Sequence, residues 1–413
     1  MYNLITMDQW IRGVSLTKAY RVRGTKQLIK SLRDKLPELT RRKHKDQTKV
    51  NKAFNLLIAN FVLVSFSDNN LIVPNKTKEF EEGGMLANLY LTRDATRSVL
   101  MSLEANGFIT KIKGSNLTKL SNLYKPTSKL TVITQPLIYC VVEKYKKSKP
   151  LDYVIFKIES NKEKARRAKT RTIETTRTNN MYIKGTGSVI KPSHPDVKNL
   201  HKINCYLSNV EYALKAPIRL VYTGDPFHGG RLYTPIQTLP NRIHKVRTNT
   251  KINNEPICEV DLSSNHPSMS MALSGKKMPS DFYQIVSDKV GLSYEVIKDY
   301  IIKAIGARNR KIKLNGRMTK YDTANIDTFI KNNYPDVFNS MYRGMGSAYQ
   351  SLEGQILMKA MLTLIDQDIP SLPVHDAIII PQRFKNNGKK ALENAWMEVL
   401  DVKFKPYIKF KMP

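Results

Sequence analysis

The pattern of apolar and polar positions divides the chain into four segments. Residues 1–50 carry basic and apolar positions at helical spacing and predict a basic helical segment. Residues 51–135 hold enough apolar positions for a compact unit with its own core. Residues 136–200 turn polar and basic, and predict a linker, an arm or a thumb-like region. Strand and helix patterns return over residues 201–413, so we expect a second, larger folded unit there.

A helix and two strands are predicted in the later part of the first compact unit. Thr92 is suited to cap the helix, and Asn106-Gly107 is suited to end it. Residues 108–112 and 120–124 alternate like strands, with a turn at residues 113–116. Together with the apolar helix that precedes them, these elements predict two helices followed by a hairpin.

Two helices followed by a two-stranded wing resemble a winged helix-turn-helix domain. In that fold the second helix lies in the major groove of DNA. The resemblance implies that Arg93, Asp94, Thr96 and Arg97 face DNA. A winged helix that contacts another protein is the alternative, and the basic charge around the segment favours DNA.

The larger unit places its chemistry-bearing residues where predicted elements end. A strand with apolar flanks ends at Asp261, and a turn rich in Ser and Asn leads into an apolar helix at residues 269–273. Residues 350–365 carry apolar positions at helical spacing. Two short apolar runs then enclose His375-Asp376, which predicts a hairpin with this pair at its tip.

The charge of the chain points to a polyanionic partner. The 413 residues include 68 Lys and Arg against 35 Asp and Glu, a net charge of +33. Phosphate backbone would neutralise such an excess. A membrane partner is not expected, because the longest apolar run, residues 55–66, is far below the roughly 20 residues of a span. Without a secretory signal, CxxC pair or even disulfide set, the chain fits a reducing cytoplasm and has no Cys-based zinc site.

Asp261 and Asp376 form the candidate catalytic pair. Two acids at the ends of separate strands can meet in space and hold two Mg²⁺ ions, or Mn²⁺, about 3.5–4 Å apart. Taken singly, an Asp before a turn caps a helix and a His-Asp pair makes turn contacts. The order of these two motifs, and the motifs around them, favour the metal site.

Four blocks in residues 225–385 resemble the palm of family A DNA polymerases. That family has a Gly-Arg-Leu segment, a motif beginning Asp-Tyr-Ser, a helix opened by a Gln-rich turn, and Val-His-Asp-Glu. Phage-type single-subunit RNA polymerases are similar, and so is a group of phage- and plasmid-borne proteins with GGRxY, DxSxxHP and LPVHD. The blocks in this chain, in the family order, are Gly230-Arg231-Leu232-Tyr233 with Leu239-Pro240, Asp261-Leu262-Ser263-Ser264, Gln350 to Met361, and Val374-His375-Asp376.

The resemblance implies a fold and a role for each matching residue. The fold would be α+β, a right-hand palm with helical fingers. Asp261 and Asp376, with the Leu262 carbonyl, would hold the metal ions, and His375 would support the primer terminus. Arg231 and Gln350 would contact the minor groove of the primer–template. The fingers helix would present Lys298 to the triphosphate, and the alternatives for that role are Lys303, Arg308 and Arg310.

Three departures leave the sugar of the substrate open. His266 stands five positions after Asp261, where the DNA polymerases have a Glu that blocks a ribose 2′-OH, so it would face the nucleotide. Ala377 replaces the acid after the second Asp, and Gly306 stands where the fingers helix has a tyrosine. We therefore expect a template-dependent nucleotidyltransferase that uses nucleoside triphosphates in phage, plasmid or mobile-element replication. Its partner is a DNA primer–template, or a DNA template with nascent RNA.

Three alternatives remain. An RNA polymerase or primase would use rNTPs. A non-catalytic initiator or regulator would bind DNA without making bonds. A nuclease would use the same paired carboxylates to cleave phosphodiesters.

Overall fold

The computed structural model is a mixed α+β structure that falls into two compact units. Unit 1 comprises Met1–Lys146, Glu211–Ala216 and Thr238–Asn254, and unit 2 comprises Lys147–Val210, Pro217–Gln237 and Glu255–Pro413. Within the described part of the chain, no helix combines the length and the apolar character needed to cross a membrane. The structure describes residues 13–15, 21–22, 26–41, 43–65, 70–73, 80–81, 91–112, 122–139, 141–142, 153–158, 181–184, 193–223, 228–239, 241, 245–310, 312 and 318–413.

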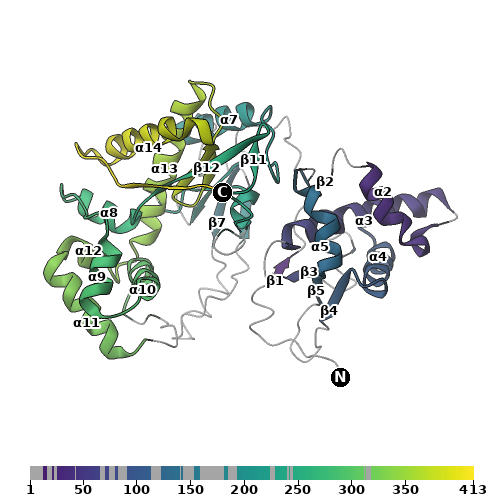
Figure 1. The fold of residues 1–413 in the computed structure, drawn as a ribbon, viewed down its shortest axis with the longest axis horizontal. Coiled ribbons are helices and arrows are strands. Elements are labelled where there is room, and N and C mark those ends of the chain that lie inside the picture. The colour runs from purple at the N-terminus through teal and green to yellow at the C-terminus, as the bar shows by residue number, and fades with distance from the viewer. Residues whose placement is uncertain are drawn as a thin grey trace. The chain divides into compact units, whose positions relative to one another are not determined.

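Unit 1 packs helices on a small sheet of strand order β1-β3-β5-β4 (Figure 1). Its core forms where Phe54 and Phe61 of one helix, and Val99 and Leu103 of another, are buried. Its helices are α2 (Lys26–Asp34), α3 (His44–Ser65), α4 (Arg93–Ala105) and α5 (Ser128–Thr134), with 3-10 turns η1 (Pro37–Leu39) and η4 (Gln135–Tyr139). Its strands are β1 (Gly13–Ser15), β2 (Arg21–Val22), β3 (Asn70–Val73), β4 (Ile109–Ile112), β5 (Asn122–Pro126), β6 (Val141–Val142) and β11 (Lys251–Ile252).

The predicted strand pair of unit 1 is present as β4 and β5, which pair antiparallel. The turn predicted at residues 113–116 lies outside the described residues. The boundary predicted at residue 50 is wrong, because α3 begins at His44 and crosses it. Apolar residues mark only the buried part of that helix, so its polar first turns were assigned to the preceding segment.

Unit 2 contains a first sheet of order β10-β9-β7-β8. Its strands are β7 (Val154–Ile158), β8 (Met181–Lys184), β9 (Arg219–Thr223) and β10 (Arg231–Tyr233). Strands β7 and β9 are parallel, and the other pairs are antiparallel. The segment at residues 136–200 is therefore not only a linker, because β7 lies inside a sheet. The most basic part of it, residues 162–171, lies outside the described residues.

The second sheet of unit 2 is antiparallel and carries both candidate acids. Its unit 2 strands run in the order β15-β12-β14-β13, where β12 is Glu255–Leu262, β13 is Leu372–Val374, β14 is Ala377–Pro381 and β15 is Ile408–Lys411. All five residues of β14 are buried, because helices cover this sheet.

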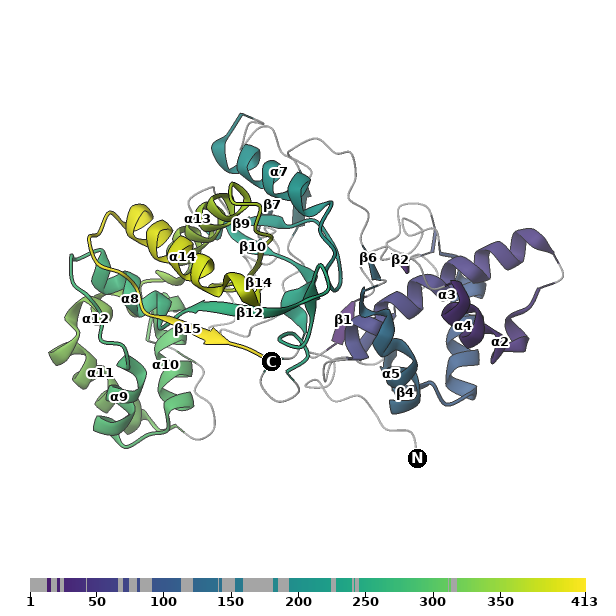
Figure 2. The same ribbon diagram turned by 45° about the horizontal axis from the view of Figure 1, so that its top comes forward.

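The helices of unit 2 fall into two groups in both views (Figures 1 and 2). Helices α13 (Gly346–Ile365) and α14 (Lys385–Leu400) lie side by side and pack on the strands. A helical group next to α8 comprises α9 (Phe282–Val290), α10 (Tyr294–Gly306), α11 (Lys320–Asn333) and α12 (Pro335–Ser340). The remaining elements are α7 (Pro195–Leu207), α8 (Asn265–Ala272), and the 3-10 turns η6 (Pro235–Thr238) and η7 (Gln382–Phe384).

Gly354 allows α13 to lie against the backbone that leads into β10. A Cβ at this position would collide with the carbonyl oxygen of Gly230. We expect Gly354→Ala to lower the free energy of unfolding by at least about 1–3 kcal/mol, the usual cost of overpacking. The lower bound applies because the colliding atom belongs to the backbone, which can shift less than a side chain can. Urea denaturation would measure it. Gly306→Ala is the matched control, since nothing lies within 4 Å of its Cβ position; equal stability of the two variants would contradict the prediction.

Candidate active site at the end of the antiparallel sheet

Asp261 lies on β12, and Asp376 lies in the turn that leads into the neighbouring strand β14. Asp261 pairs with Ala377 across β12 and β14, and the amide of Leu262 donates to the carbonyl of Asp376 over 3.3 Å. Val374 pairs with Ala377, so His375 and Asp376 form the turn between β13 and β14, as predicted. His375 is exposed and has a left-handed backbone with φ of 54°. The register of three strands therefore brings the two acids together.

The two carboxylates raise the energy of each other's ionised form. Burial, and then the charges of Asp261 and Glu353, together raise the pKa of Asp376 to about 8. Burial also raises the pKa of Asp261, while the ammonium groups of Lys411 and Lys298 lower it. A divalent cation would relieve this repulsion, and carboxylate oxygen is the ligand that Mg²⁺ prefers. The pair therefore fits Mg²⁺.

The protein supplies few acidic ligands beyond this pair. Among the described residues, no group of three or more His, Cys, Asp or Glu side chains is arranged to hold a metal ion. A cation here would therefore complete its coordination with backbone oxygens, water or substrate, as Mg²⁺ commonly does.

Lys411 occupies the side of Asp261 that faces β15. Its ammonium donates to Glu259 over 2.7 Å and also to Asp261. Lys411 pairs with Glu259 in the β12–β15 ladder, which puts their side chains on one face of the sheet. Glu259 is only 1% exposed. Neither residue was predicted from the sequence, and only Glu259 leaves a signal there, as a charge inside an apolar strand.

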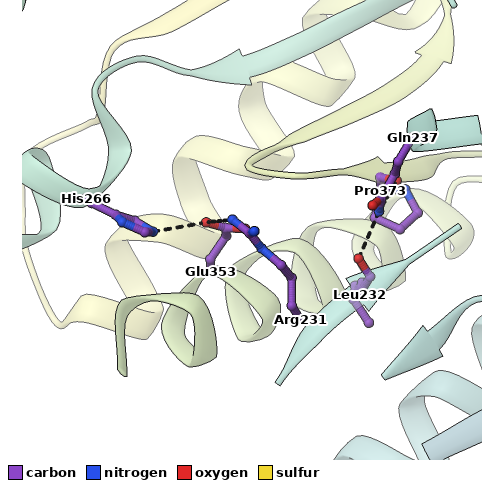
Figure 3. A network of polar contacts seen from close by, with 6 residues as sticks. All are labelled: Arg231, Leu232, Gln237, His266, Glu353 and Pro373. Atoms are coloured by element: carbon purple, nitrogen blue, oxygen red, sulfur yellow. Dashed lines mark hydrogen bonds and ion pairs between the residues drawn. The ribbon is translucent and has the colours of Figure 1, made fainter. Parts of the chain in front are cut away.

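Glu353 joins Arg231 and His266, as Figure 3 shows. Arg231 donates through Nε to Oε1 over 2.9 Å and through Nη2 to Oε2 over 3.3 Å, and His266 Nε2 lies 3.3 Å from Oε2. Burial would raise the pKa of Glu353, but hydrogen bonds and charge from His266 and Arg231 hold it below its usual range. The charge of Glu353 also reaches Asp376. The sequence analysis missed Glu353, although a Glu among the apolar positions of α13 was visible.

Hydrogen bonds join strand β13, which leads into the turn at His375-Asp376, to the segment formed by β10 and the 3-10 turn η6. Thr234 Oγ1 and Gln237 Nε2 both donate to the carbonyl of Pro373, over 3.2 and 3.3 Å. Gln237 also donates to the carbonyl of Leu232, as Figure 3 shows. These bonds hold β13, and hence the turn that carries Asp376, against the segment that carries Arg231.

Lys298 is a basic residue of α10 whose charge acts on Asp261, since it lowers the pKa of that carboxyl. The alternatives have other partners. Lys303 forms an ion pair with Asp299 over 2.7 Å. Arg308 packs under Gly344, and Arg310 lies over the ring of Tyr342. The structure thus brings Lys298 toward Asp261.

Gln350 is half-buried on α13, three residues before Glu353 and so on the same face of the helix. Arg231, the other residue predicted to contact the minor groove, is hydrogen-bonded to the same Glu353. Gln350 thus lies on the helix face of Glu353, the residue that binds Arg231.

On α4, Arg93 and Arg97 are exposed but Thr96 is not. Thr96 is 2% exposed and its hydroxyl donates to the carbonyl of Thr92 over 2.8 Å. The prediction that Thr96 faces DNA is therefore wrong. Position 96 lies on the same helix face as the buried Val99, Leu100 and Leu103, a spacing that was present in the sequence. Thr92 is the N-cap residue, but its side chain makes no capping bond.

Comparisons with known proteins add little to this geometry. No protein-family model matches the chain, and no curated protein matches it. A solved structure that is similar is the POL domain of Pol1 from M. smegmatis in complex with DNA primer-template and dNTP. The match has a TM-score of 0.31 and 11% sequence identity, and it covers 52% of this chain and 50% of that chain. The chain thus spans about half the length of that structure, and a likeness this weak carries no argument about activity.

The raised pKa of Asp376 makes stability depend on pH in the metal-free protein. Between pH about 4 and pH about 8 the folded protein holds one more proton at this site than the unfolded chain, so its stability falls as pH rises. One proton corresponds to at most about 1.4 kcal/mol per pH unit. We expect Asp376→Asn to remove this dependence of stability on pH. The measurement is the free energy of unfolding of the variant and of wild type, each determined in EDTA between pH about 4 and pH about 8. Parallel pH curves for the two proteins would contradict the assignment.

Proposed function

We propose that unit 2 is a template-dependent nucleotidyltransferase that extends a nucleic acid strand. One observation carries the proposal: the register of β12 and β14, with the turn after β13, places Asp261 beside Asp376. Lys298 supports it, because its positive charge acts on Asp261 from a separate helix. In this proposal the second sheet of unit 2 is the palm and the helical group around α10 is the fingers.

Each residue of the site has a role in that reaction. Asp261 and Asp376, with the Leu262 carbonyl, would hold Mg²⁺ or Mn²⁺, which supplies charge to activate a terminal hydroxyl and to stabilise pyrophosphate. The 3′ oxygen forms a bond to the α-phosphorus of the nucleotide. The bond between that phosphorus and the oxygen that bridges to the β-phosphate breaks, and pyrophosphate leaves. The hydroxyl proton passes to solvent, and Lys298 neutralises the leaving group.

The other predicted residues position the nucleic acid and the incoming nucleotide. Arg231 and Gln350 border the primer–template, His375 supports the primer terminus, and His266 faces the sugar. The partners are a DNA primer–template, or a DNA template with nascent RNA, and nucleoside triphosphates. In this proposal the protein replicates or primes the DNA of a phage, plasmid or mobile element.

A primer-extension assay with Mg²⁺, run separately with dNTPs and rNTPs on primed and unprimed templates, tests the proposal. Extension with dNTPs supports the DNA polymerase. Extension with rNTPs, or synthesis without a primer, supports the RNA polymerase or primase. No product on any template, with DNA binding intact, favours the initiator or regulator. Loss of substrate without nucleotides identifies a nuclease.

Unit 1 is proposed as the winged-helix domain that binds DNA through the exposed face of α4. We expect the double variant Arg93→Ala/Arg97→Ala to weaken DNA binding about 10–100-fold and to reduce its salt dependence, because each arginine lost removes a phosphate or base contact. Fluorescence anisotropy over a salt series measures both. Extension of a supplied primer should continue.

Lys49→Ala is the control for that double variant, since Lys49 is a half-exposed cation on α3 that pairs with Asp46. It should change DNA affinity little. A loss of extension equal to the loss of binding in Arg93→Ala/Arg97→Ala contradicts the assignment of DNA docking to unit 1.

A further inference from the structure

Lys411 is bonded to the proposed metal site by two acceptors on one strand. Its ammonium donates to the carboxylates of Glu259 and Asp261, which lie two residues apart on β12 and so on the same face of the sheet. Because β15 ends at Lys411 and pairs with β12 in register, the position of this ammonium is set by the backbone ladder.

Lys411 supplies positive charge beside the carboxylates of the proposed metal site. Lys411 pairs with the carboxylates of Glu259 and Asp261, and Asp261 lies beside Asp376. The positive charge of Lys411 also acts to lower the pKa of Asp376. Lys411 thus already supplies part of the positive charge that a divalent cation would bring.

We propose that Lys411 is a resident cation that competes with divalent metal for Asp261, so that the C-terminal strand sets the metal concentration at which the site fills. The inference rests on the proposed function for the place where the metal binds. Two effects produce the competition: the ammonium occupies one oxygen of the Asp261 carboxylate, and its charge repels a second cation at close range.

Glu259 makes the exchange feasible. It is buried, and its Oε1 accepts from Lys411 over 2.7 Å. When Lys411 releases Asp261 it therefore keeps a charged partner, and the release does not leave an unpaired ammonium. A lysine bonded to Asp261 alone would lose its carboxylate partner on metal binding.

Binding of Mn²⁺ to the full-length protein, without DNA or nucleotides, tests the proposal by electron paramagnetic resonance of free Mn²⁺. We expect Lys411→Met to tighten Mn²⁺ binding roughly tenfold, because one positive charge leaves the site. Lys411→Gln, which keeps a donor for Glu259, should show the same gain. Lys411→Arg should bind as wild type does. The gain must disappear in the double variant Asp261→Asn/Lys411→Met.

Lys409→Met is the matched control. Lys409 is exposed, lies on the same strand and face, and pairs with Asp261 in register, yet among the described residues it forms no ion pair with these acids. Its loss should leave Mn²⁺ affinity within about twofold. Thermal melting of each variant establishes that β15 remains folded.

Equal Mn²⁺ affinity in wild type, Lys411→Met and Lys411→Gln overturns this inference and leaves the proposed function standing. Absence of Mn²⁺ binding in every variant overturns both the inference and the proposed metal site.

Discussion

Replacing either Asp261 or Asp376 with Asn is expected to reduce primer extension by at least about 10³-fold, with DNA binding retained. The amide keeps the shape of the side chain but removes the charge that a metal ion requires. Because the two acids act as one unit, the double variant should be hardly worse than either single variant. Single-turnover extension of a labelled primer with saturating Mg²⁺ measures the loss.

The control for these variants removes a carboxylate elsewhere in unit 2. Asp366 is exposed and pairs with Lys202 on the surface, so Asp366→Asn should retain wild-type extension. Extension within tenfold of wild type in both Asp261→Asn and Asp376→Asn would show that this pair is not the catalytic centre.

Glu353→Ala is expected to cause the largest loss of stability, about 3–5 kcal/mol. Glu353 is 1% exposed and is the carboxylate shared by Arg231 and His266, so its removal leaves a largely buried guanidinium without its counter-charge. For a unit of about 240 residues, this corresponds to a fall in melting temperature of about 2–4 °C per kcal/mol. Urea denaturation and thermal melting, followed by circular dichroism, measure it.

The control for Glu353→Ala is a second paired glutamate, Glu398, whose partner Lys359 lies on α13. Glu398 pairs with Lys359, and both side chains are exposed, so Glu398→Ala should cost less than about 1 kcal/mol. The double variant Arg231→Met/Glu353→Met should recover part of the stability, because it removes both members of the main ion pair. Equal stability of Glu353→Ala and Glu398→Ala would mean that the buried network does not stabilise unit 2.

Local elements around the site were predictable, because each depends on residues close in sequence. The turn at His375-Asp376 followed from two flanking apolar runs, and α13 followed from apolar positions at helical spacing. Strand β7 was overlooked, since five residues of strand pattern stand within a long polar and basic segment. The burial of Thr96 was available from the same periodicity that identified α4, but it was outweighed by the resemblance to a DNA-reading helix.

The sequence by itself determined that Asp261 stands near the end of one strand and Asp376 at the tip of a hairpin. Only the tertiary structure decided what surrounds them. Lys411 meets Asp261 through a pairing of strands 150 residues apart, and Glu353 meets Arg231 across 122 residues. Such contacts depend on strand register and helix packing, which no local pattern encodes. The ordinary surface charges of the sequence and the buried ones are the same residue types, and only folding distinguishes them.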